Sequence, residues 1–194
     1  GVRIPQRLAT AIVYGIGSET QNLGRDTTPR DLAAYQSFFP KANMKSLWRI
    51  SYPQRTEDFF RTLARGTRDA FVCGRVIGAH LGAVQTPDRV AQMADILLTL
   101  EGMRWSVVTA RYNGKLHVSL RANDAGAEAG RLLKRLLGGG NRGGGHGMIA
   151  GGSVEVGATA SELAWREAED KVTKDFLESQ RADPAQLLWP FREA

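Results

Sequence analysis

Apolar residues recur at helical spacing before residue 70 and alternate with polar residues in several later segments. Residues 8–16 are apolar on nearly all sides, which predicts a buried helix that ends near Gly15–Gly17. Thr28 and Pro29 suit the N-cap and the first position of a second helix. Its expected apolar stripe is Leu32, Tyr35 and Phe39.

Two more helices are expected before the pattern changes. Met44, Leu47 and Trp48 indicate a short helix that ends before Pro53. Residues 56–69 then form a helix that we interpret as a connector between two domains. Its pattern places Phe59, Phe60 and Leu63 inward and Arg61, Arg65 and Arg68 outward.

From residue 70 onwards the pattern is that of an α/β domain. Residues 71–77 have the composition of a strand. Thr86 and Pro87 open a helix that Gly102 closes. The apolar stripe of this helix is Val90, Met93, Ala94, Leu97 and Leu98.

A β-hairpin is the strongest local prediction. Strand patterns at 104–112 and 115–121 are joined by Asn113-Gly114, a pair that suits a type I′ turn because both positions need positive φ. A two-residue loop then sets the register. Arg121 is expected opposite Ser106, and His117 opposite Ala110.

Two helical patterns follow the hairpin. The first covers residues 126–137, with Ala129, Leu132, Leu133 and Leu136 as its stripe. The second is an acidic amphipathic helix at 159–180, which Trp165, Val172 and Phe176 would dock on the body. The last apolar residues, Trp189, Pro190 and Phe191, form either a final anchor or part of an interface.

These elements predict the α/β fold class. We expect helices at residues 1–52, a linker helix at 53–69 and a compact α/β domain at 70–157 with a hairpin-containing mixed sheet flanked by helices. A helical tail at 158–194 completes the chain.

Composition limits the environment of the protein. No apolar run reaches the roughly 18 residues that cross a bilayer, so no membrane partner is expected. The single cysteine, Cys73, cannot form an intrachain disulfide and is predicted to be a buried structural thiol, which fits a cytoplasmic location. Gly1 without an initiating methionine indicates that the natural protein extends upstream.

The charge is unevenly distributed. Residues 1–152 hold 21 Lys and Arg against 11 Asp and Glu, whereas residues 153–194 hold 5 against 9. A basic body favours anionic partners such as phosphates or nucleic acid.

The glycine-rich run 138–152 is the main candidate for chemistry, since nine of its 15 residues are glycine. Clustered glycines let a ligand approach the backbone N–H groups closely. A helix beginning near Gly145 would add its positive dipole end, which suits phosphate. Arg142 and His146 flank this cradle as directional donors.

Two other interpretations of the run are weaker. A flexible linker does not need the embedded His-Gly-Met-Ile-Ala. Residues 145–150 fit the dinucleotide pattern G-x-G-x-x-A, but that motif follows a strand, and here the preceding residues are helical by period. The chain contains no G-x-x-x-x-G-K-[ST] loop, so a Walker-type NTPase is excluded.

Three segments, in order, resemble the DHH-type phosphoesterases. Residues 143–152 are similar to the GGGHxxAxG signature of the DHH-associated domain, and Ser119-Leu120-Arg121 to the Ser-x-Arg strand end before it. Residues 8–20 resemble ATALxxGIxTDTG at the end of the DHH domain. The resemblance spans about residues 6–156.

This resemblance implies a substrate-binding role. Members of the superfamily hydrolyse phosphodiester or phosphoanhydride bonds. By resemblance, Gly144, Gly145 and His146 contact a phosphate, and Arg121 pairs with an anionic group of the substrate. A guanidinium offers phosphate a planar fork, and an imidazole gains charge readily beside an anion.

The resemblance also implies two divalent ions, commonly Mn²⁺, held by an N-terminal domain. The chain has no Asp-His-His run, and its histidines are His80, His117 and His146. Glu19 stands where the family has a metal-binding Asp, and Gln21 replaces the following Gly. Glu19 is therefore the candidate metal ligand, and no residue of this chain is assigned a catalytic role.

Three functions follow as hypotheses. The first is the substrate-binding C-terminal portion of a hydrolase, a metal-dependent phosphoesterase that acts on nucleotides or short oligonucleotides, and this chain alone would be inactive. The alternative is a non-catalytic nucleic-acid or nucleotide-binding module. The third is a structural domain that forms a homodimer through the acidic tail helix.

Overall fold

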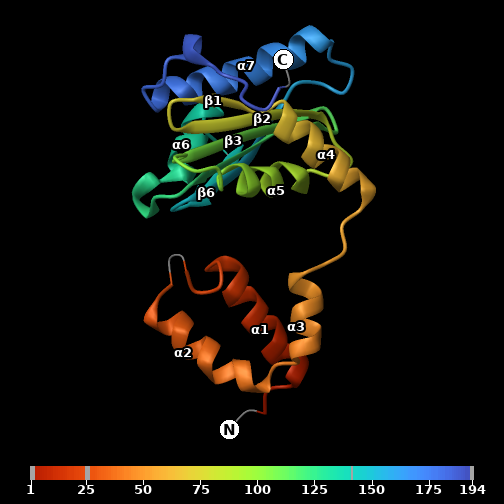
Figure 1. Ribbon diagram of the computed structural model, residues 1–194, viewed down its shortest axis with the longest axis vertical. Helices are drawn as coiled ribbons and strands as arrows, with labels where there is room; N and C mark the ends of the chain where they lie inside the picture. Colours follow the sequence, from red (N-terminus) through yellow and green to blue (C-terminus); the bar gives the residue numbers. More distant parts are fainter. Residues whose placement is uncertain (1–2, 25–26, 141, 193–194) are drawn as a thin grey trace. The chain divides into compact units, whose positions relative to one another are not determined.

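The computed structural model describes residues 3–24, 27–140 and 142–192. Gly1 and Asn141, which belong to the start and to the glycine run discussed above, lie outside the described residues. The chain divides into two compact units, Gly1–Arg55 and Thr56–Ala194, here called unit 1 and unit 2 (Figure 1).

Unit 1 is helical, with α1 at Gln6–Glu19, α2 at Pro29–Phe38, a 3-10 turn η1 at Phe39–Lys41 and α3 at Met44–Ser51. The predicted cap of the second helix is confirmed, because the Thr28 hydroxyl accepts from the Asp31 N–H and Asp31 accepts from the Thr28 N–H. The predicted end of the first helix was wrong. α1 continues through both glycines to Glu19, because neither glycine takes the left-handed conformation that ends a helix.

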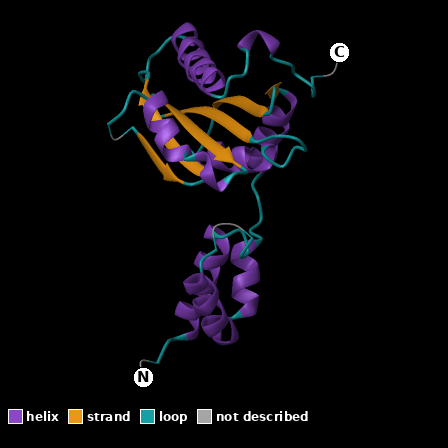
Figure 2. Cartoon of the chain, turned by 90° about the vertical axis from the view of Figure 1, so that its left-hand side faces the viewer, coloured by secondary structure: helices purple, strands orange, loops and turns teal. Residues whose placement is uncertain are grey.

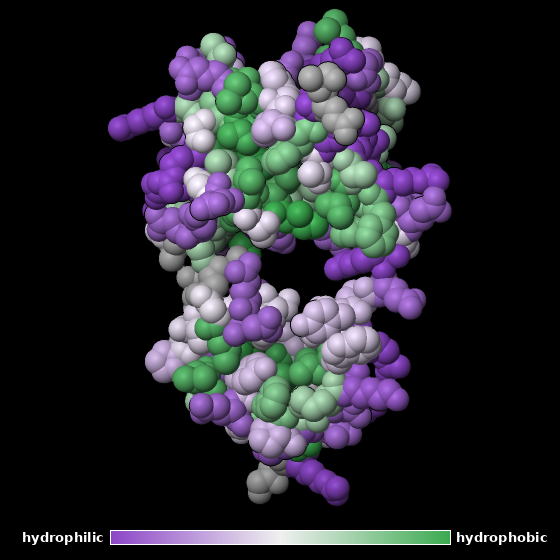
Figure 3. Space-filling view, in the orientation of Figure 1, coloured by the Kyte–Doolittle hydropathy of each residue, from purple (hydrophilic) through white to green (hydrophobic). Residues whose placement is uncertain are grey.

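The apolar surface of unit 1 is largely exposed. α1 buries one side only, through Ala9, Thr10 and Val13, so the all-round burial expected of it was wrong. α2 buries no residue, so its predicted stripe does not form a core. The space-filling view shows apolar side chains at the surface of unit 1 (Figure 3). The large apolar residues exposed here are Leu8, Tyr14, Leu32, Phe39, Met44, Trp48, Ile50 and Tyr52.

Unit 2 is built on a mixed six-stranded sheet with helices on both faces (Figure 2), which confirms the predicted fold class. The strand order is β1-β2-β3-β4-β6-β5, where β2 and β3 are parallel and the other pairs antiparallel. The strands are β1 (Phe71–Cys73), β2 (Val76–Ala83), β3 (Trp105–Tyr112), β4 (Lys115–Ala122), β5 (Gly143–His146) and β6 (Ile149–Glu155).

The single strand expected at residues 71–77 is a hairpin. Gly74, with φ of 57°, turns the chain so that β1 pairs back on β2, with Cys73 opposite Val76. The apolar run continues on both sides of this turn, which is why the pattern did not reveal it. Cys73 is buried as predicted, its thiol donates to the Asp183 carbonyl, and burial raises its pKa.

The β3–β4 hairpin is confirmed together with its register. Asn113 and Gly114 have φ of 48° and 75°, as a type I′ turn requires. Ser106 pairs with Arg121, and Ala110 pairs with His117.

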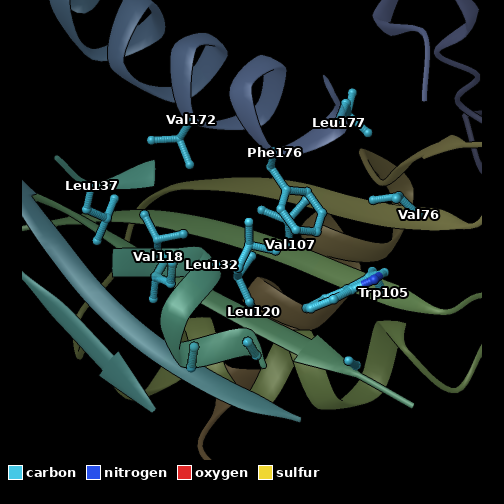
Figure 4. Packing of buried hydrophobic residues seen from close by; sticks show 14 of the residues in the cluster. Val76, Trp105, Val107, Val118, Leu120, Leu132, Leu137, Val172, Phe176 and Leu177 are labelled. Carbon is cyan, nitrogen blue, oxygen red and sulfur yellow. The ribbon is translucent and has the colours of Figure 1, made fainter. Parts of the chain in front are cut away.

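The two faces of the sheet carry different helices. α4 (Glu57–Arg68) and α5 (Asp88–Leu97) cover one face, and α6 (Ala129–Leu136) and α7 (Glu162–Ser179) cover the other (Figure 1). Phe176 and Val172 of α7 pack on Val107 and Val118 of the sheet (Figure 4), as the stripe of the tail helix predicted. Within the described residues, no helix is both long and apolar enough to span a membrane.

Two predictions about these helices needed correction. Phe60 is 59% exposed, and α4 instead buries Thr62 and Gly66 against its neighbours. α6 begins at Ala129, because Glu128 takes a left-handed conformation after the short turn η2 (Ala125–Ala127). After the turn η3 (Pro184–Gln186), Leu188 bridges to Val72, so the backbone anchors the tail. The side chains of Trp189 and Phe191 are exposed, and their role in an interface stays a prediction.

A pH dependence of stability follows from His80. Its Nδ1 lies 2.7 Å from the Thr109 hydroxyl, and burial lowers its pKa below the ordinary 6.5. The carboxylates of Glu169 and Asp170 oppose this shift and Arg111 reinforces it. Below about pH 6.5 the unfolded chain takes up a proton that the buried imidazole does not. The free energy of unfolding should therefore decrease as the pH is lowered. Urea denaturation at pH 7.5 and 5.5 measures it, and His80→Gln should show a smaller difference between the two.

Candidate functional site

The predicted substrate residues lie in β4 and β5, the two strands on either side of β6. The pairing of β4, β6 and β5 places Arg121, Ile149 and His146 in one cross-strand row. Ser119, Gly151 and Gly144 form the next row on the same face. Cross-strand partners project to the same side of a sheet, so Arg121 and His146 share the face that α5 covers in part.

The glycine run is a β-hairpin, so the helix expected near Gly145 was wrong. Gly143–His146 pairs antiparallel with β6 around Gly147 and Met148, at the edge of the sheet. Glycine is a poor helix former, and here pairing with β6 satisfies the backbone groups of the run that face β6. Ser153 N–H bonds to Arg142 O, and the alternation of an antiparallel ladder then directs the N–H groups of Gly143 and Gly145 away from β6.

One face of this hairpin is closed by α6. Gly130 packs so tightly that a Cβ placed there would overlap the carbonyl oxygen of Gly145. A Cβ on Gly152 would lie 2.6 Å from Leu137. The glycines on this side are thus required for close packing of helix and strand.

The opposite face of the hairpin is open. A Cβ added to Gly144 or Gly151 would meet no atom within 4 Å. These two residues pair with each other, and the row beside them ends in the exposed side chain of His146. The result is a floor of bare backbone, here called the glycine floor, bordered by Ser119 and by the row of Arg121 and His146.

Arg121 is held firmly beside this floor. It is 7% exposed, its Nε donates to Asp95 Oδ1 of α5 at 2.6 Å, and its Nη1 donates to Ser119 Oγ at 2.7 Å. Nη1 also reaches the carbonyls of Leu120 and Ala150. Among the residues the structure describes, Nη2 has no hydrogen-bond partner, which leaves that amino group available to a ligand.

Asp95 was missed by the sequence reasoning. It lies next to the buried stripe of α5, and only the packing of α5 on β4 brings it to Arg121. Arg142 bonds to the Leu137 carbonyl at the end of α6. His117 is half-buried, and burial together with Lys115 lowers its pKa.

Glu19, the candidate metal ligand, is exposed at the last position of α1 in unit 1. Within the described ranges, no three His, Cys, Asp or Glu side chains come together as a metal site. The described residues therefore do not by themselves fit a bound divalent ion.

Fold and site define an α/β domain with a fixed arginine, a histidine and a glycine floor at one end of its sheet. The chain belongs to the DHHA1 domain family, which matches residues 73–174. The predicted DHH-associated domain is thereby confirmed.

Individual relatives extend this comparison. The uncharacterized protein MJ1633 of Methanocaldococcus jannaschii is 29% identical over 178 residues, which cover 90% of this chain and 36% of that protein. An exopolyphosphatase-related protein from Bacteroides fragilis has the same fold, with a TM-score of 0.66 and 16% identity, over 91% of this chain and 53% of that one. A pGpG-specific phosphodiesterase, PggH from Vibrio cholerae, matches with a TM-score of 0.39 and 12% identity, over 84% of this chain and 54% of that one. The chain thus spans about a third to a half of the length of these three proteins.

Proposed function

We propose that this chain is the substrate-binding portion of a phosphoesterase that cleaves phosphodiester or phosphoanhydride bonds of nucleotides or short oligonucleotides. The observation that carries the proposal is the row of Arg121 and His146 beside the open glycine floor. A phosphate placed on this floor meets no Cβ of Gly144 or Gly151 and finds a guanidinium and an imidazole on the same face of the sheet. Charged donors of this kind bind phosphate strongly.

Asp95 has a positioning role in this proposal. Its bond to Nε fixes the guanidinium plane, and Ser119 holds Nη1, so the free Nη2 has one direction. A preorganised donor loses little side-chain entropy when the ligand binds.

Unit 1 fits the same proposal as the end of a larger domain. Residues 1–52 would be the C-terminal end of a DHH domain and 53–69 the linker helix, followed by the substrate-binding domain and the helical tail. The exposed apolar side chains of α1, α2 and α3 support this, because such surface is normally buried against a neighbour. In the full-length protein, divalent ions such as Mn²⁺ would be held mainly by that larger domain, with Glu19 as one ligand.

Binding of the dinucleotide pApA, measured by isothermal titration calorimetry, tests the site. His146→Ala is expected to weaken binding about tenfold, since hydrogen bonds that involve a charged group contribute about 1.5–3 kcal/mol. His117→Ala is the matched control, because His117 lies on the same sheet face four residues along β4 from Arg121. Equal affinity of the wild type and the His146→Ala variant would refute the assignment.

An assay of the full-length protein with Mn²⁺ separates the two functions. Hydrolysis of pApA that decreases in the His146→Ala variant supports the phosphoesterase. Binding without any hydrolysis supports the non-catalytic nucleotide-binding module instead.

A further inference from the structure

A second basic pocket lies away from the glycine floor, on the side of the sheet that α6 and α7 cover. It has a volume of about 520 Å³ and is formed by the β1–β2 turn, the start of β3, α6 and the end of α7. Its lining includes five arginines, Arg75, Arg104, Arg131, Arg135 and Arg181. We call it the arginine pocket.

Positive charge exceeds negative charge in this pocket. The acidic side chains that line it are Asp124 and Glu128, which pair with Arg104 at 2.8 Å and with Arg131 at 2.7 Å. Within the described part of the chain, Arg75, Arg135 and Arg181 have no carboxylate partner. Three unpaired guanidinium groups around one concave surface raise its potential and attract an anion.

Two of these arginines lie one turn apart on α6. Arg131 lies in the first turn of α6, where the helix dipole disfavours a cation. Arg135 lies four residues further along, so the two like charges are neighbours on the helix surface. Arg131 pairs with Glu128 and Arg135 lies in the last turn, where the helix dipole favours a cation, but an anion bound between them would relieve the repulsion of the two like charges.

Arg181 provides an independent observation. It follows the C-cap Gln180 of α7 and has φ of 56°, at a position where helices strongly prefer glycine. A side chain is disfavoured in that conformation. Arg181 nevertheless lines the pocket, which indicates that an arginine matters more here than the local backbone preference.

The floor of the pocket is apolar. Val76, Trp105 and Leu132 line it, and all three belong to the core cluster drawn in Figure 4. The volume of the pocket is within the range of small-molecule sites and exceeds the size of a single phosphate ion. An apolar floor under a cationic rim suits a ligand with an organic body and a phosphate.

We infer that the arginine pocket is a second binding site, specific for an organic phosphate of about mononucleotide size. The ligand is either a free nucleotide or the 5′-phosphorylated end of an oligonucleotide, because both present the same chemistry. This site is separate from the glycine floor and does not depend on the function proposed for it.

Calorimetric titration with AMP tests the inference in the His146→Ala background, where binding at the glycine floor is weakened. Adding Arg135→Gln and Arg181→Gly should lower the remaining affinity at least about tenfold, since both remove charged donors to phosphate. Arg30→Gln with Arg49→Gln is the control. Both arginines are exposed in unit 1, and the two substitutions remove the same two positive charges as the pocket variant. The thermal midpoint of the Arg181→Gly variant should not fall below that of the wild type, since glycine suits the position.

Each outcome decides a different point. If the pocket variant binds AMP as tightly as its parent does, a 5′-phosphorylated tetranucleotide is titrated next. A loss of tetranucleotide affinity in the pocket variant assigns the ligand to a strand end, and unchanged affinity for both probes overturns the inference. If inorganic phosphate binds as tightly as both probes, the specificity for an organic phosphate is refuted. The two sites can also give opposite results. If the pocket variant loses affinity for AMP while His146→Ala leaves the affinity for pApA unchanged, the arginine pocket is supported and the proposed function is refuted.

Discussion

Gly130→Ala is expected to lower the free energy of unfolding of unit 2 by about 3 kcal/mol, at the upper end of overpacking costs. The added Cβ would overlap the backbone carbonyl of Gly145, which is fixed in the β5–β6 ladder and cannot move aside by changing a rotamer. Relief requires α6 to separate from the hairpin. Urea denaturation monitored by circular dichroism measures the loss.

Gly151→Ala is the matched comparison, because the same methyl group is added to the open face of the same hairpin. Its Cβ meets nothing within 4 Å, so we expect a stability change within about 0.5 kcal/mol, as for other surface positions. The affinity for pApA should nevertheless fall, since the methyl group occupies the glycine floor. Equal destabilisation by the two substitutions would contradict the description of one closed and one open face.

Arg111→Ala should destabilise unit 2 by about 3–5 kcal/mol, the usual cost of leaving a buried charge without its partner. Arg111 of β3 donates to both carboxylate oxygens of Glu169 at 2.8 Å, and Glu169 is 4% exposed on α7. It also donates to Glu162 and lies over the ring of Trp165. These carboxylates raise the pKa of Arg111 further above its ordinary value, so its guanidinium stays charged at any ordinary pH.

The double variant Arg111→Met with Glu169→Leu distinguishes charge from packing. Apolar residues of similar size often replace a buried ion pair at no net cost, so the double variant should recover most of the stability lost in Arg111→Ala. The free energies of unfolding of both variants and of the wild type, measured in urea, complete the comparison. A double variant as unstable as Arg111→Ala would show that the loss comes from the geometry of α7 docking.

Local predictions were the most successful, because the interactions that decide them lie within a few residues. The Thr28 cap, the Asn113-Gly114 turn and the register of Arg121 against Ser106 follow from backbone preferences and from the period of a strand. The docking stripe of α7 was equally accessible, since helical spacing alone places Val172 and Phe176 on one face.

The glycine run shows where this reasoning reached its limit. Its composition indicated close approach of a ligand to the backbone, but a helix was expected where β5 forms. Strand pairing is a long-range interaction, and nothing within the run specifies that Gly144 pairs with Gly151 beside Ser119. The division of the glycines between a closed and an open face depends on α6, which approaches from one side only.

The amino-acid sequence by itself determined the class of the fold, the family and the chemical types gathered at the site, because periodicity, turn preferences and the GGGH run are properties of neighbouring residues. The tertiary structure decided which groups meet: Asp95 with Arg121, Glu169 with Arg111, and five arginines around one pocket. These partners are separated along the chain by up to about a hundred residues, and only the order of the strands and the packing of the helices on them bring their charges within reach of one another.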